Sequence, residues 1–350
     1  MNTNSGIPPG LLEATRLTRA GRLVEATALI QRTLGQSGDR RNGAGRVIDA
    51  EFTTVADRVE EKPSAIDTAP GQFIDGSYTN QAGTRPYKLY IPAGYVGQAL
   101  PLTVMLHGCT QTPDDFAAGT RMNARADERP CFVLYPAQTV AANRSKCWNW
   151  FKRADQRRDE GEPAIIAGMT RDVLHRYGMD ARKVYVAGLS AGGAMAAVMG
   201  AAYPDLYAAA GIHSGLASGA AHDLPSALAA MRGPPASAHG GNLSSGSASR
   251  VPTIVFHGDR DTTVHPRNGE HVIAQSVAPG GDVAEEQGRA GGRAYTRTVH
   301  RDAEGRVVLE HWVVHGAGHA WSGGSKGGSF ADPKGPDAAR EMLRFFLQQE

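Results

Sequence analysis

The chain has 350 residues, of which 41% are hydrophobic and 21% charged, and its formal net charge at pH 7 is +2. This balance predicts a globular protein with one large core and an appendage, and it excludes a disordered chain or a basic nucleic-acid-binding surface. We expect no membrane partner, because no apolar run approaches the ~18 residues of a spanning helix. The first ten residues lack the basic start and apolar stretch of a signal peptide, which predicts a cytoplasmic location.

Residues 1–70 are predicted to form a helical segment and a linker. Leucine and isoleucine recur at near-helical spacing from Leu11 to Leu34, with Gly21 between the two halves, which indicates a helical hairpin or one kinked amphipathic helix. From Gly35 to Pro70 the chain is polar, rich in glycine and charge, and without periodicity, as is typical of a linker. We interpret the helix as a docked or dimerising element rather than as part of a site.

From Gly71 onward, short apolar runs alternate with helical segments, which predicts an α/β fold over residues 71–350 with a mostly parallel sheet flanked by helices. Residues 164–178 carry apolar side chains on one face of a predicted helix. Residues 294–314 are expected to form an antiparallel hairpin that turns at residues 303–305. The runs predicted to be strands are RPYKLYIP, PLTVMLHG, CFVLYPAQ, KVYVAGLS, LYAAAGIHSG, VPTIVFHGD and LEHWVVHG.

Residues 232–250 are rich in glycine, serine and proline, which predicts a flexible surface insertion in this domain. Such an insertion is either a plain loop or a lid over the site. We favour the plain loop.

Ser190 is the predicted nucleophile of a hydrolase. It follows the apolar run KVYVAGL and precedes small residues that suit a helix, so it lies at a strand-to-helix turn. Gly188 and Gly192 complete the pattern G-x-S-x-G, in which glycines allow backbones to pass close to a serine held in strained φ/ψ. The alternative interpretation, a serine that only caps the helix, leaves both glycines unexplained.

A serine hydroxyl needs an imidazole to take its proton and a carboxylate to orient that imidazole. In hydrolases with this turn, the acid and then the histidine follow the serine along the chain. Asp259 and Asp261 both lie in the loop after the run VPTIVFHG. We choose Asp261, because Asp259 is nearer the turn and suits an Asx turn.

His319 is the predicted base among the six histidines that follow Asp261. It lies between small residues in GAGHAW, after the last buried run, where a loop can place an imidazole over the nucleophile. His315 is interpreted as a strand-end residue. The remaining four are assigned to the helix after the acid loop or to the hairpin, and they are His265, His271, His300 and His311.

The oxyanion formed during acyl transfer needs two preorganised N–H donors. One is predicted to be the amide of Ala191, which directly follows the nucleophile at the N-terminus of the helix. The other is expected from the loop after the run PLTVMLHG, through the amide of Cys109 or of its neighbour Thr110. A tight turn without function is the alternative interpretation of that loop.

The chain has three cysteines, too few for a disulfide framework and without the spacing of a metal site, so no metal is predicted. Cys131 opens an apolar run and is expected in the core. Cys109 and Cys147 both lie in loops. If any two cysteines pair, we expect these two.

Trp148, Trp150 and Trp321 are candidates for an aromatic wall that binds the substrate. The first two lie in the loop after the run CFVLYPAQ, and the third follows the predicted base. Loops at the carboxyl ends of parallel strands line the site in such folds, which places these rings near it. Packing in the core is an equally good interpretation.

The motifs LHGCTQ, CWNWF, GLSAGGAM, HGDRDTTV and GAGHAWSGG, in this order, resemble those of the polyhydroxybutyrate depolymerase-like esterases. These are α/β-hydrolases related to feruloyl and acetylxylan esterases. The resemblance covers residues 71–350, and it extends more loosely to the helix EATRLTRAGRLVEAT. It implies an α/β-hydrolase fold, no cofactor, and a catalytic triad of Ser190, Asp261 and His319.

The resemblance also implies a serine esterase that hydrolyses hydroxyalkanoate polymer or oligomers through an acyl-enzyme. Deferuloylation or deacetylation of plant polysaccharide is the alternative within enzymes, and an inactive binding or scaffold protein is the alternative outside them. The intact Ser, Asp and His set argues against a scaffold, and the lack of a substrate-selecting repeat domain argues against a peptidase. The amino-terminal helix is then a candidate for homodimer formation or attachment to polymer granules.

Secreted polymer-degrading members carry an export signal and often a separate substrate-binding domain. We find neither in this sequence. This difference favours an intracellular depolymerase or an esterase for soluble esters, and it agrees with the predicted cytoplasmic location. Secretion is the alternative, since many members of the family are extracellular.

Overall fold

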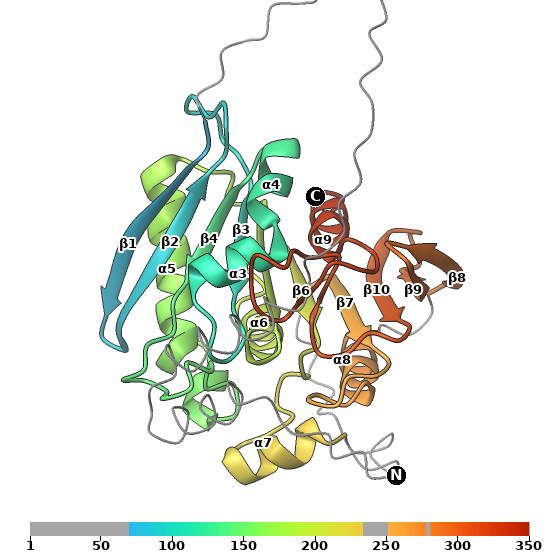
Figure 1. Cartoon of the computed structure of the whole chain (residues 1–350). Coiled ribbons are helices and arrows are strands. Elements are labelled where there is room, and N and C mark those ends of the chain that lie inside the picture. Colours follow the sequence, from blue (N-terminus) through green and yellow to red (C-terminus); the bar gives the residue numbers. More distant parts are fainter. Residues whose placement is uncertain (1–69, 234–250, 278–280, 350) are drawn as a thin grey trace, which may run out of the picture. The chain divides into compact units, whose positions relative to one another are not determined.

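Ten strands form one mixed sheet in the computed structural model, which describes residues 70–233, 251–277 and 281–349 (Figure 1). Their order across the sheet is β1-β2-β4-β3-β5-β6-β7-β10-β9-β8. These strands are β1 (Gln72–Asn80), β2 (Gly83–Ile91), β3 (Leu102–Leu106), β4 (Phe132–Pro136), β5 (Val184–Leu189), β6 (Ala209–His213), β7 (Thr253–Gly258), β8 (Val283–Ala290), β9 (Arg293–Arg301) and β10 (Val307–Val314). A separate short sheet pairs β11 (Trp321–Ser322) with β12 (Ala331–Asp332).

The middle of the large sheet is parallel and its two sides are antiparallel. From β4 through β3, β5, β6 and β7 to β10, each strand is parallel to its neighbour. The strands β1, β2, β9 and β8 add antiparallel pairs at the sides. Central strands are buried on both faces, which explains continuous apolar runs such as LTVML in β3.

Helices cover both faces of the sheet (Figure 1). On one face, α5 and α6 pack against Val104 and Val186, and α8 lies beside α6 on the same face. On the other face, α3, α4 and α9 pack against Met105 and Tyr185, because successive strand residues point to opposite faces. The helices are α3 (Pro113–Thr120), α4 (Met122–Glu128), α5 (Gly161–Tyr177), α6 (Ala191–Ala202), α7 (Leu224–Met231), α8 (Arg267–Ser276) and α9 (Ala338–Phe346), with a 3₁₀ turn η1 (Arg153–Gln156).

This architecture confirms the predicted α/β-hydrolase fold. Each of the seven apolar runs predicted to be strands coincides with all or most of one, and β2 and β10 begin two residues before their runs. The predicted hairpin is β9 and β10 with its turn at residues 302–306. The helix predicted at residues 164–178 is α5, which begins three residues earlier. In the large sheet two strands were not predicted, β1 and β8, and both lie at its edges, where polar residues are tolerated. The short strands β11 and β12 of the second sheet were not predicted either.

Two predicted segments lie outside the described residues. One is the amino-terminal helix from Leu11 to Leu34 with its linker, and the other is nearly all of the insertion at residues 232–250. The helix α7 ends at the start of that insertion, with Arg232 as its C-cap.

The parallel strands bring the predicted site residues to one edge of the sheet. Ser190 follows β5, Asp261 follows β7, His319 follows β10, and Cys109 follows β3. Because these four strands point the same way, the loops that leave their carboxyl ends meet at a common edge.

Candidate active site

Ser190 lies in a strained turn between β5 and α6. Its φ of 58° and ψ of −120° are a conformation that residues other than glycine rarely adopt. The backbone N–H of Ser190 donates to the carbonyl oxygen of His213 at the end of β6, with an N···O distance of 2.9 Å. Strain of this kind persists only where the surrounding structure enforces it, and it is concentrated at functional sites.

The two glycines of the motif have the close approach that the sequence predicts. A Cβ on Gly188 would lie 2.4 Å from the backbone of Gly192, and a Cβ on Gly192 would lie 1.9 Å from the carbonyl oxygen of Leu106 in β3. Any side chain at either position would force the turn away from the sheet. The two glycines therefore allow Ser190 to lie close to the loop after β3, residues 107–112. We call this segment the oxyanion loop after its predicted role.

Asp261 and His319 form a buried pair. The His319 Nδ1 lies 2.6 Å from the Asp261 Oδ2, and the aspartate side chain has no exposed surface. The other carboxylate oxygen accepts hydrogen bonds from the backbone N–H groups of Thr263 at 2.8 Å and Val264 at 2.9 Å. Asp261 is thus held by both of its carboxylate oxygens, and its contact with Nδ1 fixes the orientation of the His319 ring.

Burial would raise the pKa of Asp261, but hydrogen bonds from His257 and His319 and the nearby histidine charge outweigh it and lower that pKa well below its usual value. His257 is buried in β7, and its Nε2 lies 3.5 Å from the Asp261 Oδ2 and 2.9 Å from the carbonyl oxygen of Val264. Asp261 is therefore ionised throughout the neutral range, as a group that stabilises an imidazolium must be.

His213 connects the nucleophile turn to the histidine loop. Its ring stacks on Trp321 with a centroid distance of 5.0 Å, and its Nε2 accepts the backbone N–H of Ser322 at 3.0 Å. Burial, together with the charges of His257 and His319, lowers the pKa of His213 to about 3. A neutral ring with Nε2 as acceptor follows, and the backbone of the same residue accepts the N–H of Ser190.

A second Asp–His pair lies beside the first and is exposed. The His315 Nδ1 lies 2.9 Å from the Asp259 Oδ2, and the His315 Nε2 lies 2.9 Å from the hydroxyl of Thr296 in β9. The other oxygen of Asp259 accepts the backbone N–H of Gly316 at 2.7 Å. Both ring nitrogens of His315 thus have partners, and His315 directly follows β10, in agreement with its interpretation as a strand-end residue.

The oxyanion loop lies against the nucleophile. A Cβ on Gly108 would lie 3.6 Å from the Ser190 Cβ. The backbone N–H of Thr110 donates to the carbonyl oxygen of Ser145 at 2.7 Å, so Thr110 is not available as an oxyanion donor, and this alternative is corrected. The candidate donors are then the amides of Cys109 and Ala191, the second of which begins α6, where helix amides lack intrahelical partners.

Cys109 and Cys147 form a disulfide, the pair that the sequence favoured. It links the oxyanion loop to the loop that follows β4. Cys131 is a free and buried cysteine, as expected of a core residue.

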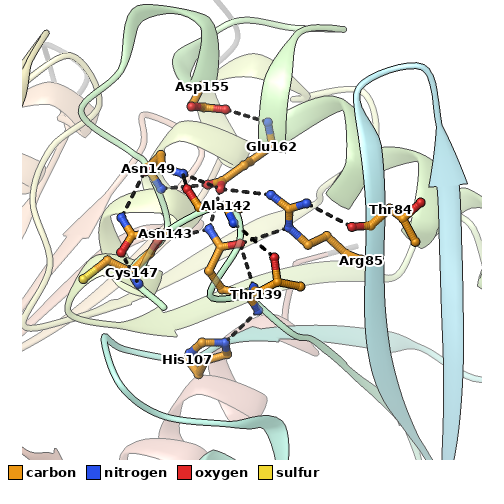
Figure 2. Close-up of polar contacts among 11 residues, drawn as sticks. Thr84, Arg85, His107, Thr139, Ala142, Asn143, Cys147, Asn149, Asp155 and Glu162 are labelled. Atoms are coloured by element: carbon orange, nitrogen blue, oxygen red, sulfur yellow. Dashed lines mark hydrogen bonds and ion pairs between the residues drawn. The ribbon is translucent and has the colours of Figure 1, made fainter. Parts of the chain in front are cut away.

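Figure 2 shows a network of polar contacts that includes three residues of that second loop, Asn143, Cys147 and Asn149. Glu162, in the first turn of α5 and 3% exposed, accepts the backbone N–H and the Nδ2 of Asn149, each at 2.7 Å. It also accepts the Nε2 of Gln138 and pairs with Arg85 at 3.4 Å. Burial raises the pKa of Glu162, whereas the bonds from Asn149 and Gln138 oppose the rise.

The network reaches the oxyanion loop by two routes. The backbone N–H of Gln138 donates to the Nε2 of His107 at 3.1 Å, and the Gln138 Nε2 donates to the carbonyl oxygen of Cys147 at 3.0 Å. Burial lowers the pKa of His107 to about 4, so the neutral ring carries its proton on Nδ1, facing the Gly108 oxygen at 2.7 Å. Glu162 is thus connected through Gln138 to His107 and to Cys147, which belong to the two segments that the disulfide joins.

The three candidate tryptophans are buried. Trp148 is 0% exposed, Trp150 5% and Trp321 1%, and the indole N–H groups of Trp148 and Trp321 have no hydrogen-bond partner among the described residues. The ring of Trp148 lies 5.6 Å from that of His107. Their burial supports core packing beneath the site, and contact with substrate stays a prediction.

Several site residues escaped the sequence reasoning. His107, His213 and His257 each lie at the carboxyl end of a parallel strand, and each precedes a glycine or a serine. This repeated pattern could have indicated that the three histidines lie near the site. Glu162 had no such signal, because a glutamate in a first helical turn is ordinarily exposed.

Within residues 70–233, 251–277 and 281–349, no group of three or more His, Cys, Asp or Glu side chains could hold a metal ion. In the same ranges, no helix has the length and apolar character needed to cross a membrane.

The mostly parallel sheet with helices on both faces has the architecture of the α/β-hydrolase fold. Residues 85–298 match the family model described as esterase PHB depolymerase, and the chain belongs to that family. A solved structure, the acetyl xylan esterase from Aspergillus awamori, has the same fold, with a TM-score of 0.59, 21% identity, and coverage of 80% of this chain and 100% of that one.

Curated relatives carry three kinds of name. Poly(3-hydroxyalkanoate) depolymerase C of Paucimonas lemoignei is 33% identical over 69% of this chain and 59% of its own length. Feruloyl esterase B of Neurospora crassa is 29% identical over 70% and 82%. Acetylxylan esterase A of Talaromyces purpureogenus is 30% identical over 56% and 54%. The chain spans less than two thirds of the first and third of these proteins.

Proposed function

We propose that this protein is a serine ester hydrolase that acts on polymers or oligomers of 3-hydroxyalkanoates such as poly(3-hydroxybutyrate). The observation that carries the proposal is the buried Asp261–His319 pair, at the same sheet edge as the strained Ser190. Membership of the depolymerase family and the 33% identity to a poly(3-hydroxyalkanoate) depolymerase support the substrate class.

In the first half of the proposed reaction, Ser190 Oγ attacks the ester carbonyl carbon while His319 Nε2 takes the serine proton. Asp261 stabilises the imidazolium that forms. The oxyanion of the tetrahedral intermediate accepts the N–H groups of Cys109 and Ala191. The intermediate collapses with cleavage of the C–O bond, and His319 returns its proton to the departing alkoxide, which leaves an acyl-enzyme.

In the second half, water attacks the acyl carbon as His319 takes one of its protons. The second tetrahedral intermediate expels the Ser190 oxygen, and His319 protonates it. One ester and one water are thereby converted to one acid and one alcohol, with the enzyme regenerated. No step requires a cofactor.

The second candidate is a feruloyl or acetylxylan esterase, which would use the same three residues on a different leaving group. Relatives with these names at 29% and 30% identity favour it. An inactive scaffold of the same fold is the candidate outside enzymes, and the geometry of the Asp261–His319 pair argues against it.

We propose residues 71–350 as the catalytic domain and residues 1–70 as a separate element for homodimer formation or granule attachment. The disulfide between Cys109 and Cys147 bears on location, because such bonds persist in oxidising compartments. It supports the secreted alternative over the predicted cytoplasmic location.

The test combines one variant with a panel of substrates. Wild-type protein is expected to hydrolyse hydroxybutyrate oligomers and amorphous polymer faster than feruloylated or acetylated xylan, with p-nitrophenyl butyrate as a common reference. Ser190→Ala should lower kcat on every ester by about 10⁴-fold or more, because the triad acts as a unit.

An organophosphonate should label Ser190 alone, as mass spectrometry of the digested protein would show. Label on another residue, or near-normal turnover by the alanine variant, would remove the nucleophile assignment. A preference for xylan esters would instead transfer the function to the second candidate.

A further inference from the structure

Phe330 is a large apolar side chain that lies exposed beside the predicted base. It is 47% exposed, and its ring lies edge-on to that of His319, with a centroid distance of 6.4 Å and an interplanar angle of 77°. It belongs to the loop between β11 and β12, which the mechanism above does not use. An exposed aromatic ring in this place needs an explanation.

The backbone of Phe330 is strained. Its φ of 49° is in the left-handed region, which is rare for any residue with a side chain and an outlier for a bulky one. Asparagine or glycine would adopt this conformation at lower cost. Among the residues that the structure describes, seven residues other than glycine have positive φ, and they include both the proposed nucleophile Ser190 and residues without a proposed role such as Arg121. Strain at an exposed aromatic residue points to a function for its ring.

The loop that carries Phe330 is fastened to the oxyanion side of the site. The neighbouring Ser329 donates its backbone N–H to Asp115 Oδ1 at 2.8 Å and its hydroxyl to Asp115 Oδ2 at 2.5 Å. Gln111 donates to the Ser329 carbonyl oxygen at 3.1 Å and accepts the backbone N–H of Gly108 at 2.9 Å. One side chain thus connects the Phe330 loop to the oxyanion loop.

Backbone packing reinforces this attachment. The N–H of Ser325 donates to the carbonyl oxygen of Gly119 at the end of α3 at 2.8 Å, and a Cβ on Gly328 would lie 2.2 Å from the carbonyl oxygen of Asp115. The carbonyl oxygen of Phe330 itself accepts the N–H of Trp321 at 2.7 Å. Phe330 is therefore presented by a loop that α3 and β11 hold on both sides.

We propose that Phe330 forms the apolar wall of the alcohol-side subsite and determines which leaving groups the enzyme accepts. The inference rests on the proposed ester hydrolysis. His319 must deliver its proton to the oxygen of the departing alcohol, so a ring against this imidazole borders the alcohol part of the ester rather than the acyl part.

The chemistry of the leaving groups makes this subsite selective. In a polyhydroxyalkanoate the departing alcohol is the next hydroxyacyl unit, which carries an alkyl branch next to its oxygen. In a feruloyl or acetyl ester of xylan it is a sugar covered by hydroxyl groups. A phenyl ring stabilises the alkyl group by excluding water and offers the sugar hydroxyls no hydrogen bond, so it favours the first class.

The test holds the acyl group constant and varies the alcohol. Butyrate esters of methanol, n-butanol and benzyl alcohol are compared in wild type, Phe330→Ala, Phe330→Asn and Phe330→Leu. We expect the alanine and asparagine variants to lose about tenfold in kcat/KM for the benzyl ester relative to the methyl ester, since they lose the apolar contact in the transition state. Phe330→Leu should retain most of the wild-type selectivity, because leucine keeps an apolar side chain at this position.

Two controls separate this role from a structural one. Asparagine tolerates positive φ, so Phe330→Asn should keep the Tm of the wild type while it loses the selectivity. A matched apolar truncation at Val96, which is 89% exposed in the loop between β2 and β3, should leave the alcohol series unchanged.

The outcomes are distinct. An equal loss of kcat/KM on all three butyrate esters overturns the assignment of Phe330 to the alcohol side. So does a second result, in which the Phe330 variants change the ratio of kcat/KM between methyl acetate and methyl hexanoate, which differ only in the acyl group, and leave the alcohol series unchanged. Failure of the proposed function is seen separately, as a wild-type protein without esterase activity or a Ser190→Ala variant that retains it.

Discussion

Two Asp–His pairs follow the same two strands, β7 and β10, and differ mainly in their surroundings. Asp261 and His319 meet at 2.6 Å, and Asp259 and His315 meet at 2.9 Å. The first aspartate side chain is 0% exposed and the second 37%. The buried Asp261 accepts two further backbone N–H groups, and the exposed Asp259 accepts one. In the exposed pair, the Nε2 of His315 also contacts the hydroxyl of Thr296.

This difference is our reason for proposing Asp261 and His319, rather than Asp259 and His315, as the catalytic pair. An ion pair at the surface gains little, because water solvates both partners. A buried aspartate with several donors keeps its charge and holds one ring orientation, which is what proton transfer requires. Both ring nitrogens of His315 already have partners, the Asp259 carboxylate and the Thr296 hydroxyl, so His315 is less suited to take a serine proton.

The largest expected effect separates the two histidines. His319→Ala should lower kcat on p-nitrophenyl butyrate by about 10⁴-fold or more, because the serine would lose its base. His315→Ala should retain most of the activity and lower the Tm, since it removes a contact between β9 and the loop after β10. The reverse ranking would show that the exposed pair is the catalytic one.

The two aspartates provide a second and similar separation. Asp261→Asn keeps the size of the side chain but removes the charge that orients His319, and we expect a loss in kcat of up to about 10⁴-fold. Asp259→Asn should cost far less. Equal losses in the two variants, measured on the same ester under the same conditions, would mean that the pairs act together.

A smaller effect concerns the stability of the folded protein in acid and its dependence on His213. The pKa of His213 is about 3 in the folded protein, below its value of about 6.5 in an unfolded chain. Between these values the unfolded state binds the extra proton, so stability falls as the pH is lowered through this window.

We expect His213→Gln to weaken that dependence by about one proton, because the amide oxygen can accept the Ser322 N–H but does not titrate. Urea midpoints measured from pH 7 to pH 4 would show it. Buried His107 and His311, both with pKa lowered to about 4, should keep part of the slope. An unchanged slope in the variant would mean that His213 is charged in the fold.

Much of the fold was predictable because its physical causes are local. Central parallel strands are apolar throughout, and the seven runs that the sequence shows are the strands buried on both faces or next to them. The run VAEEQGRA of β8 is polar and mostly exposed, so nothing in it distinguishes an edge strand from a loop. Edge strands of this kind are defined by their partner rather than by their own residues.

For the site, chain order and turn chemistry led to Asp261 and His319, which the structure brings together. Contacts between distant segments could not be predicted in the same way. Glu162 gains its partners from a loop before α5 and from β2, and the burial of Trp148 depends on the whole core. Phe330 gave no signal, because strain appears only in backbone angles.

The parallel pairing of β7 with β10 has a consequence for folding. Val314 lies opposite Gly258 in that register, and the whole hairpin of β8 and β9 intervenes between the two strands in the chain. Joining strands so far apart requires a loop to close before any contact rewards it, which makes such pairings slow. Both Asp–His pairs join the loop after β7 to the loop after β10, so neither pair can form before these two strands are brought together. Recovery of enzymatic turnover during refolding would therefore report that this long-range pairing has been completed.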